Sequence, residues 1–188
     1  MSNTFERVGR LHSGYDCKQV DDFLRAAKEA YANFSAQTQI KDNEVIDEST
    51  VRGVSFAWNR NGYKPFQVDA ALDRLEAAFI QRRRASVMYS KGEQAWLEQT
   101  YTAATSLYPR MQRRAGQRFA DAEKRGYLKE DVDAFLEQVA RYFDGQANLS
   151  SKEVRRQYFR SARGEKAYDE SVVDVYLDRV VSVLMAVE

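Results

Sequence analysis

The sequence predicts an all-α protein of about seven helices. Apolar residues recur at helical spacing along most of the chain, only two prolines interrupt it, and no segment has the pattern of a strand. Of the 188 residues, 44% are apolar and 30% are charged, which is enough apolar side chain for one core or two small ones. We therefore expect a folded helical protein rather than a disordered one.

A twelve-residue phrase occurs four times and defines a repeat. The copies are SGYDCKQVDDFL, NGYKPFQVDAAL, RGYLKEDVDAFL and KAYDESVVDVYL. From the tyrosine of each copy, a valine follows at +5, an aspartate at +6 and a leucine at +9. These residues are Tyr15, Val20, Asp21 and Leu24; Tyr63, Val68, Asp69 and Leu72; Tyr127, Val132, Asp133 and Leu136; and Tyr168, Val173, Asp174 and Leu177. Further apolar residues at +12 and +16 extend one helix face, which is the short form of a coiled-coil seam.

Each repeat helix has a recognisable start. Asp16 with Gln19 three residues later is a capping-box pattern, Pro65 suits the first turn of the second helix, and Asp169 is a good N-cap for the fourth. A glycine precedes the tyrosine in three copies: Gly14, Gly62 and Gly126. Glycine at this point predicts a tight turn in a backbone conformation that side chains resist. The tyrosine should then lie just outside the helix.

An aromatic-led arm precedes each tyrosine. The aromatic anchors are Phe5, Phe56, Phe119 and Phe159. The repeat unit is therefore an arm, a Gly-Tyr turn and an amphipathic helix. In the fourth arm, Ser150 and Glu153 form a capping-box pattern that predicts a short helix from Lys152 to Ala162. Residues 36–50 lack an apolar period, and we expect a frayed helix end and a linker there.

One more helix is predicted between the second and third copies. Its apolar positions are Leu97, Tyr101, Ala104, Tyr108 and Met111, and it should bend or end near Pro109. We expect repeats one and two in residues 1–90, this connecting helix in residues 91–115, and repeats three and four in residues 116–188. Short linkers favour coiled-coil-like pairing of one with two and of three with four inside one chain. Pairing between chains is the alternative.

The order of aromatic arm, Gly-Tyr, Val-Asp and Phe-Leu resembles the N-terminal domain of the DivIVA family of bacterial cell-division and cell-pole proteins. The residues that carry the resemblance are Gly14, Tyr15, Asp16, Val20, Asp21, Phe23 and Leu24, and again Arg125, Gly126, Tyr127, Val132, Asp133, Phe135 and Leu136. The chain is most similar to multi-repeat members, because it shows no long coiled-coil tail. The resemblance implies a parallel dimer whose two arms cross, and loop tips that enter membrane through an exposed apolar residue beside a basic one. In the family, higher assembly depends on the tail.

The residue types present favour no enzyme class. His12 is the single histidine and Cys17 the single cysteine, and no Walker-type loop, HExxH or GxSxG occurs. We therefore expect no catalytic residues, no metal, no cofactor and no small-molecule substrate. The +6 aspartates are interpreted as hydrogen-bond acceptors for loop backbone or for an arm cation near the positive helix start.

Positive charge gathers in the arms, although the whole chain carries only +1. Arg10 with Leu11, and Trp58 with Arg60, place an apolar residue beside a cation, which is typical of a tip resting in an anionic headgroup layer. The candidates for membrane or partner contact are Arg10, Leu11, Trp58, Arg60, Lys124, Arg125, Arg163 and Lys166. The alternative is that basic arms pair with acidic helices and contact no membrane. Acidic residues interrupt every basic stretch, which argues against nucleic-acid binding.

These features predict a non-enzymatic cytoplasmic scaffold of bacterial cell division or polar envelope growth. It would bind an anionic membrane surface, a protein of the division or envelope-growth machinery, or both, at the inner face of the cell membrane. The division role follows from the resemblance alone. The alternative is a soluble protein–protein adaptor without membrane contact. A cytoplasmic location is expected because MSNTFERVGR has no apolar stretch of signal-peptide or membrane-span length and a single cysteine forms no internal disulfide.

Overall fold

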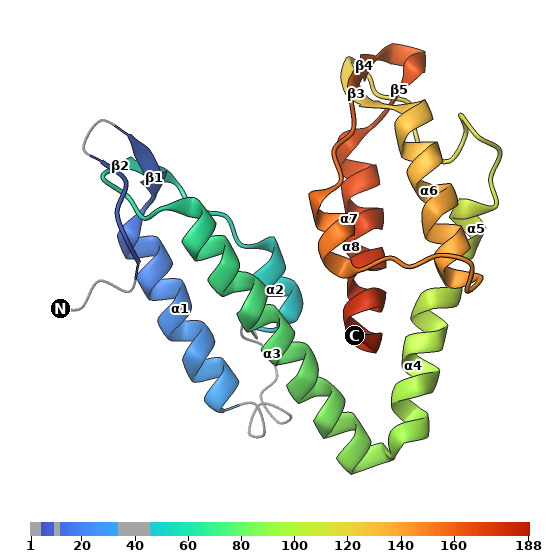
Figure 1. Cartoon of the computed structure of the whole chain (residues 1–188). Helices are drawn as coiled ribbons and strands as arrows, with labels where there is room; N and C mark the ends of the chain where they lie inside the picture. The colour runs from blue at the N-terminus through green and yellow to red at the C-terminus, as the bar shows by residue number, and fades with distance from the viewer. Residues whose placement is uncertain (1–4, 10–11, 34–45) are drawn as a thin grey trace. The chain divides into compact units, whose positions relative to one another are not determined.

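The computed structural model describes residues 5–9, 12–33 and 46–188. The chain divides into two compact units, Met1–Ala85 and Ser86–Glu188. Both units follow one plan: two repeat helices begin at a small antiparallel sheet and run away from it in the same direction (Figure 1).

Unit 1 holds repeats one and two. Its elements are β1 (Ser13–Tyr15), α1 (Cys17–Ala32), α2 (Glu48–Gly53), β2 (Trp58–Arg60) and α3 (Pro65–Lys91), whose last residues pass into unit 2. The antiparallel register of β1 and β2 sets Tyr15 opposite Trp58 and Ser13 opposite Arg60. The arm of repeat two therefore pairs with the Gly-Tyr segment of repeat one. Arg7 in the arm of repeat one bridges Tyr63 of repeat two in return.

Unit 2 holds repeats three and four. Its helices are α4 (Glu93–Thr105), α5 (Tyr108–Met111), α6 (Lys129–Phe143), α7 (Ser151–Arg156) and α8 (Glu170–Val187). Its strands are β3 (Arg125–Leu128), β4 (Ser161–Arg163) and β5 (Ala167–Tyr168), in the order β4-β3-β5. Strand β3 carries the Gly-Tyr of repeat three, and it pairs with the arm of repeat four through β4. Asp121, in the arm of repeat three, bridges Tyr168 of repeat four.

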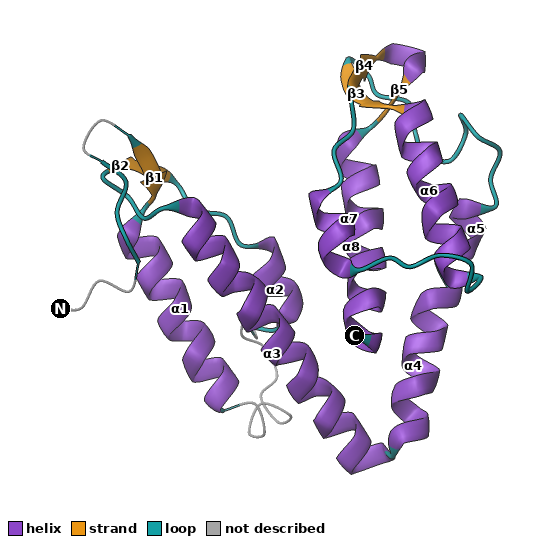
Figure 2. Cartoon of the chain, viewed as in Figure 1, coloured by secondary structure: helices purple, strands orange, loops and turns teal. Residues whose placement is uncertain are grey.

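The prediction of an all-α fold is wrong. The helix number agrees with the expected seven or so, since the described residues form eight α-helices of which α5 has only four residues, but two antiparallel sheets accompany them (Figure 2). Each strand has only two to four residues, which is too short for the alternation that identifies a strand in a sequence. The sheets form because crossing arms bring backbone groups together that need hydrogen-bond partners.

The predicted N-caps are present, but the capping box at Asp16 is only half formed, because the Gln19 side chain accepts from the Ala57 N–H instead of the Asp16 N–H. Asp16 accepts a hydrogen bond from the Gln19 N–H at 2.9 Å, and Asp169 accepts from the N–H groups of Ser171 and Val172. Ser150 and Glu153 form the full capping box at the start of α7.

Two predicted boundaries in the arms of repeats two and four are wrong. The helix of the fourth arm ends at Arg156 rather than Ala162, because residues 161–163 form β4 instead. Residues 48–50 of the expected linker belong to α2, which Asp47 caps by accepting from the Thr50 N–H at 2.9 Å.

The apolar stripes of paired helices form the two cores. In unit 2 six stripe residues have no exposed surface: Val132, Leu136, Val139, Val173, Val180 and Leu184. In unit 1 the fully buried stripe residues are Val20, Ala27, Val68 and Phe79. Burying one such valine, leucine or phenylalanine is worth about 1.5–3 kcal/mol, so the repeated stripe is the main force that holds each pair together.

The connecting helix ends near Pro109 as expected, but one of its predicted buried positions is wrong. It breaks at Ser106 and Leu107 into α4 and α5, and the buried Leu107 carbonyl accepts a hydrogen bond from the Tyr176 hydroxyl at 2.9 Å. Met111 is buried as expected, but Leu97 is 53% exposed. Trp96, one residue earlier, takes the buried position and its indole N–H donates to the Ala186 carbonyl at 3.3 Å.

Candidate functional site

The tyrosine hydroxyl of one repeat meets the +6 aspartate of its partner repeat. In unit 1 the buried Tyr63 donates to the carboxylate of Asp21 at 3.1 Å. Burial, and then the carboxylate of Asp69, raise the pKa of Tyr15, which is half-buried. The tyrosine and aspartate of the repeat signature therefore join two repeats, which the sequence interpretation of the aspartates missed.

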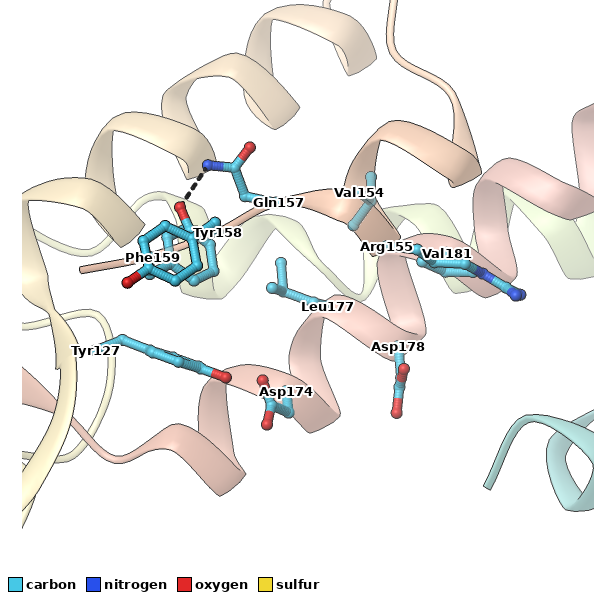
Figure 3. A pocket seen from close by; sticks show the side chains of 10 residues that line it. All are labelled: Tyr127, Val154, Arg155, Gln157, Tyr158, Phe159, Asp174, Leu177, Asp178 and Val181. Atoms are coloured by element: carbon cyan, nitrogen blue, oxygen red, sulfur yellow. Dashed lines mark hydrogen bonds between the residues drawn. The ribbon is translucent and has the colours of Figure 1, made fainter. Parts of the chain in front are cut away.

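The same exchange occurs in unit 2. The fully buried Tyr168 donates to Asp133 at 3.1 Å. Figure 3 shows Tyr127 directed toward Asp174; burial first, and then this carboxylate, raise the pKa of Tyr127 to about 12. Asp133 also accepts from the Gly116 N–H at 2.6 Å, so for this aspartate the expected contact with loop backbone is present as well.

The glycines of the signature permit a close backbone contact rather than an unusual backbone angle. None of Gly14, Gly62 and Gly126 has a positive φ. A Cβ atom on Gly126 would lie 2.0 Å from the Tyr168 carbonyl oxygen, and one on Gly14 would lie 2.3 Å from the Tyr63 carbonyl oxygen. The expected reason for glycine is therefore wrong: only a hydrogen fits where the two Gly-Tyr segments cross.

The arms cross, and each arm phenylalanine packs against the tyrosine of the partner repeat. The ring pairs, with centroid distances, are Phe5–Tyr63 (5.4 Å), Phe56–Tyr15 (5.5 Å), Phe119–Tyr168 (5.3 Å) and Phe159–Tyr127 (5.2 Å). Tilted and edge-on ring pairs at this distance contribute about 0.5–1.5 kcal/mol each beyond their burial. The resemblance implied crossed arms, and in this chain the crossing occurs within each unit.

In three of the four arms, a backbone N–H forms a hydrogen bond that holds the arm against the helix of the partner repeat. The N–H that follows the arm phenylalanine donates to the side chain at +4 of the partner repeat. These bonds, each 2.9 Å long, run from Glu6 to Gln67, from Ala57 to Gln19 and from Arg160 to Asp131. Repeat four has Val172 at +4, which cannot accept. The polar residue at +4 in these three repeats is the sequence signal that could have predicted this hydrogen bond.

The strand tip of unit 1 presents an aromatic residue beside a cation. Trp58 is 64% exposed, its ring lies 5.3 Å from the ring of Tyr15, and Arg60 is exposed two residues later on β2. The other two candidates for this tip, Arg10 and Leu11, lie outside the described residues. A contiguous exposed apolar patch rimmed by polar residues marks a contact surface, and here the patch is formed by Trp58 with the half-buried ring of Tyr15.

The strand tip of unit 2 is cationic. Arg125 and Arg163 lie directly opposite each other on β3 and β4, and Lys124 and Lys166 are exposed beside them. Like charges at opposed positions destabilise a sheet. Arg125 donates to the Ser161 hydroxyl at 2.7 Å, but no ion pair between described residues includes any of these four cations. The tip of unit 2 therefore has the charge, but not the apolar residue, of the tip of unit 1.

A groove of about 550 Å³ runs beside the arm of repeat four (Figure 3). Tyr127 and Phe159 lie at one end, and Asp174 and Leu177 line its α8 side. Tyr158, on its rim, is 80% exposed.

Neither a metal centre nor a membrane span is formed by the part of the chain that the structure describes. Residues 5–9, 12–33 and 46–188 contain no group of three or more His, Cys, Asp or Glu side chains arranged to hold a metal ion. None of the helices in these ranges combines the length and the apolar character needed to cross a bilayer.

No family model, curated protein or solved structure matches this chain. We therefore describe the class of protein from the arrangement of its repeats. It is a tandem of two repeat pairs with crossed arms, in which each pair carries an exposed basic strand tip.

Proposed function

We propose that this chain is a non-enzymatic scaffold that acts in bacterial cell division or polar envelope growth, at the cytoplasmic face of the cell membrane. Its strand tips contact the anionic membrane surface, and its grooves bind a protein of the same machinery. The cellular role rests on the resemblance to the DivIVA family, and the binding role rests on the surfaces of the two units.

The observation that carries this proposal is the pair of strand tips. The opposed Arg125 and Arg163 have no carboxylate partner among the described residues, so an anion placed between them would reduce their mutual repulsion. Trp58, 64% exposed beside Arg60, has the apolar body and polar edge that favour the interface of a bilayer. Each basic residue near an anionic bilayer contributes about 1 kcal/mol, so several are needed for binding.

The alternative function is a soluble protein–protein adaptor. The groove beside the arm of repeat four favours it, because Tyr158 and Leu177 offer apolar surface to a partner chain without any membrane. In this alternative the basic tips contact acidic residues of the partner protein.

Co-sedimentation with vesicles distinguishes the two functions. We expect the full chain to bind vesicles with anionic lipid and not neutral vesicles, and binding should weaken as salt rises, because charge attraction is screened beyond about 10 Å at 0.1 M. Arg60→Glu combined with Arg163→Glu should abolish binding. The matched control, Lys28→Glu with Lys152→Glu, changes the net charge equally at exposed sites away from the tips. Absence of binding to both kinds of vesicle at low salt would refute membrane contact and leave the adaptor.

A further inference from the structure

A second groove lies in unit 1, between the arm of repeat one and the outer face of α3. Its volume is about 760 Å³, and its lining includes Phe5 and Arg7 from the arm and Phe66, Ala70 and Arg74 from α3. The three α3 residues are four positions apart, so they form one stripe along the helix surface. This stripe is on the outside of the helix pair, because Val68 and Phe79 face the core.

Phe66 breaks the pattern of the repeat. It stands at +3 from its tyrosine, where the other three repeats have the polar residues Lys18, Glu130 and Ser171. Its side chain is 66% exposed, so it does little for the core of unit 1. Together with Phe5 and Ala70 it forms an apolar patch in a groove that also holds Arg7 and Arg74, and an apolar patch rimmed by polar residues marks an interaction site.

The charged residues around Phe66 indicate the charge of the molecule that would bind there. Arg7 and Arg74 are exposed, and neither takes part in an ion pair with any described residue. Glu6 also lines the groove, but Lys64 neutralises it at 2.5 Å. The groove therefore offers apolar surface between two cations that form no ion pair with the residues the structure describes.

A similar groove in unit 2 differs in the position of its exposed aromatic side chain and in its charges. It lies between the arm of repeat four and α6, measures about 450 Å³, and has Ala134 and Gln138 where α3 has Ala70 and Arg74. Its arginine, Arg160, already forms an ion pair with Asp131 at 2.6 Å. Its exposed aromatic side chain, Tyr158, belongs to the arm and not to the helix. An exposed apolar anchor on the helix stripe, beside cations outside any ion pair between described residues, is thus found in the groove of unit 1 and not in this one, although the two grooves are built by the same crossing of arm and helix.

We propose that the unit 1 groove docks a short acidic segment of a partner protein. One aromatic or aliphatic side chain of the segment packs on Phe66 and Ala70, and its carboxylates pair with Arg7 and Arg74. The inference deepens the proposed scaffold function, since it defines the chemistry of the protein partner, and it does not depend on membrane contact by the strand tips.

Peptide display tests the inference on the full chain. A library of random twelve-residue peptides is selected against the folded protein, and one enriched peptide is titrated by fluorescence anisotropy. We expect enriched peptides to combine acidic residues with one apolar anchor. Phe66→Ser, which installs the residue of repeat four, and Arg74→Glu should each raise the peptide Kd about tenfold or more. Circular dichroism verifies that both variants remain folded.

Two matched controls separate the groove from general surface effects. Val175→Ser removes another exposed apolar side chain from the outer face of a repeat helix, and Lys28→Glu reverses an exposed charge on α1. Both should leave the peptide Kd within about twofold of the wild-type value. A selection without enrichment, peptides without acidic residues, or equal binding to Phe66→Ser would each overturn the inference.

The vesicle assay keeps this inference distinct from the proposed membrane contact. The variant with Arg60→Glu and Arg163→Glu should still bind the peptide, even if no form of the protein binds vesicles. If Phe66→Ser instead lost vesicle binding while peptide binding was unchanged, the groove would be a membrane contact and the peptide site would be refuted.

Discussion

The hydroxyl of Tyr168 lies 3.1 Å from the carboxylate of Asp133, which belongs to the partner repeat. The same hydroxyl accepts the backbone N–H of Arg118 at 3.0 Å. Arg118 is 5% exposed and Asp133 is 8% exposed, so neither has ready access to water as a substitute partner. One oxygen atom thus connects the arm of repeat three, helix α6 and the turn of repeat four, and it fixes how these repeats pair.

Replacing Tyr168 with phenylalanine should destabilise the protein. The change leaves the ring in place but removes the acceptor of a buried N–H and one donor to a buried carboxylate, at a cost of about 1–3 kcal/mol. Urea denaturation measures the change in the free energy of unfolding. Tyr158→Phe removes a hydroxyl from a side chain that is 80% exposed and should change stability by less than about 0.5 kcal/mol. Equal effects of the two substitutions would show that the Tyr168 hydroxyl does not join the repeats.

The helical half of the fold could be predicted from the sequence because its signals are local. Val20 and Leu24 repeat at fixed offsets in all four copies, and Asp16 and Ser150 mark helix starts within three residues of their partners. Such signals depend on residues within a few positions of one another, and the helices form where these signals predict them.

The sheets and the cross-repeat contacts could not be predicted from local signals. β1 and β2 pair residues that are more than forty positions apart, and neither three-residue strand has a pattern of its own. The role of Asp133 likewise depends on Tyr168, which reaches it only after the arms cross. For the candidate site, charge composition drew attention to the arms, whereas the exposure of Phe66, and the absence of an ion pair between Arg74 and any described residue, required the folded structure.

Gly126→Ala should be strongly destabilising. The added Cβ would lie 2.0 Å from the Tyr168 carbonyl oxygen and 2.8 Å from the Cβ of Ala122, so the two crossing segments must move apart. Overpacking of this kind costs about 1–3 kcal/mol, or more where the clash is with backbone. Thermal and urea unfolding measure the loss.

Gly53→Ala is the matched control for this substitution. Gly53 ends α2, has no positive φ, and has no atom within 4 Å of its added Cβ. Alanine there should be neutral or should stabilise the protein by about 0.4–1 kcal/mol, because it reduces the conformational entropy of the unfolded chain. A Gly126→Ala variant as stable as Gly53→Ala would contradict the close crossing of the two Gly-Tyr segments.

The ion pair of Asp131 with Arg160 should make stability depend on pH in the acid range. Hydrogen bonds from the Arg160 side chain, and then from its backbone N–H, hold the pKa of Asp131 below its ordinary value of 3.8. A carboxylate with a lowered folded-state pKa contributes its full stabilisation above the unfolded-state value and loses it as the pH falls through the folded-state value. Asp131→Asn should therefore lose less stability than the wild type between pH 5 and the acid transition.

Urea midpoints across this pH range test the ion pair. Arg160→Gln, which removes the other partner, should flatten the pH dependence in the same way, because Asp131 then returns toward its ordinary pKa. Other carboxylates with lowered pKa values, such as the N-cap Asp169, should still make the free energy of unfolding depend on pH in both variants. An Asp131→Asn variant with the same slope as the wild type would mean that the ion pair is too solvent-exposed to couple to folding.

The chain should be a monomer in solution. The apolar stripe of each repeat helix packs against a stripe of the same chain, α1 against α3 and α6 against α8. The Tyr–Asp contacts and the crossed arms also join repeats of one chain, so a second molecule is not needed to supply them. Covalent linkage raises the effective concentration of the partner repeat to about the millimolar range, which outcompetes weak association between chains. Light scattering on a sizing column should then give the mass of one chain, 21.7 kDa, across a wide range of concentrations. A constant mass of two chains or more would show that the arms cross between molecules, and the intramolecular pairing of the repeats would be refuted.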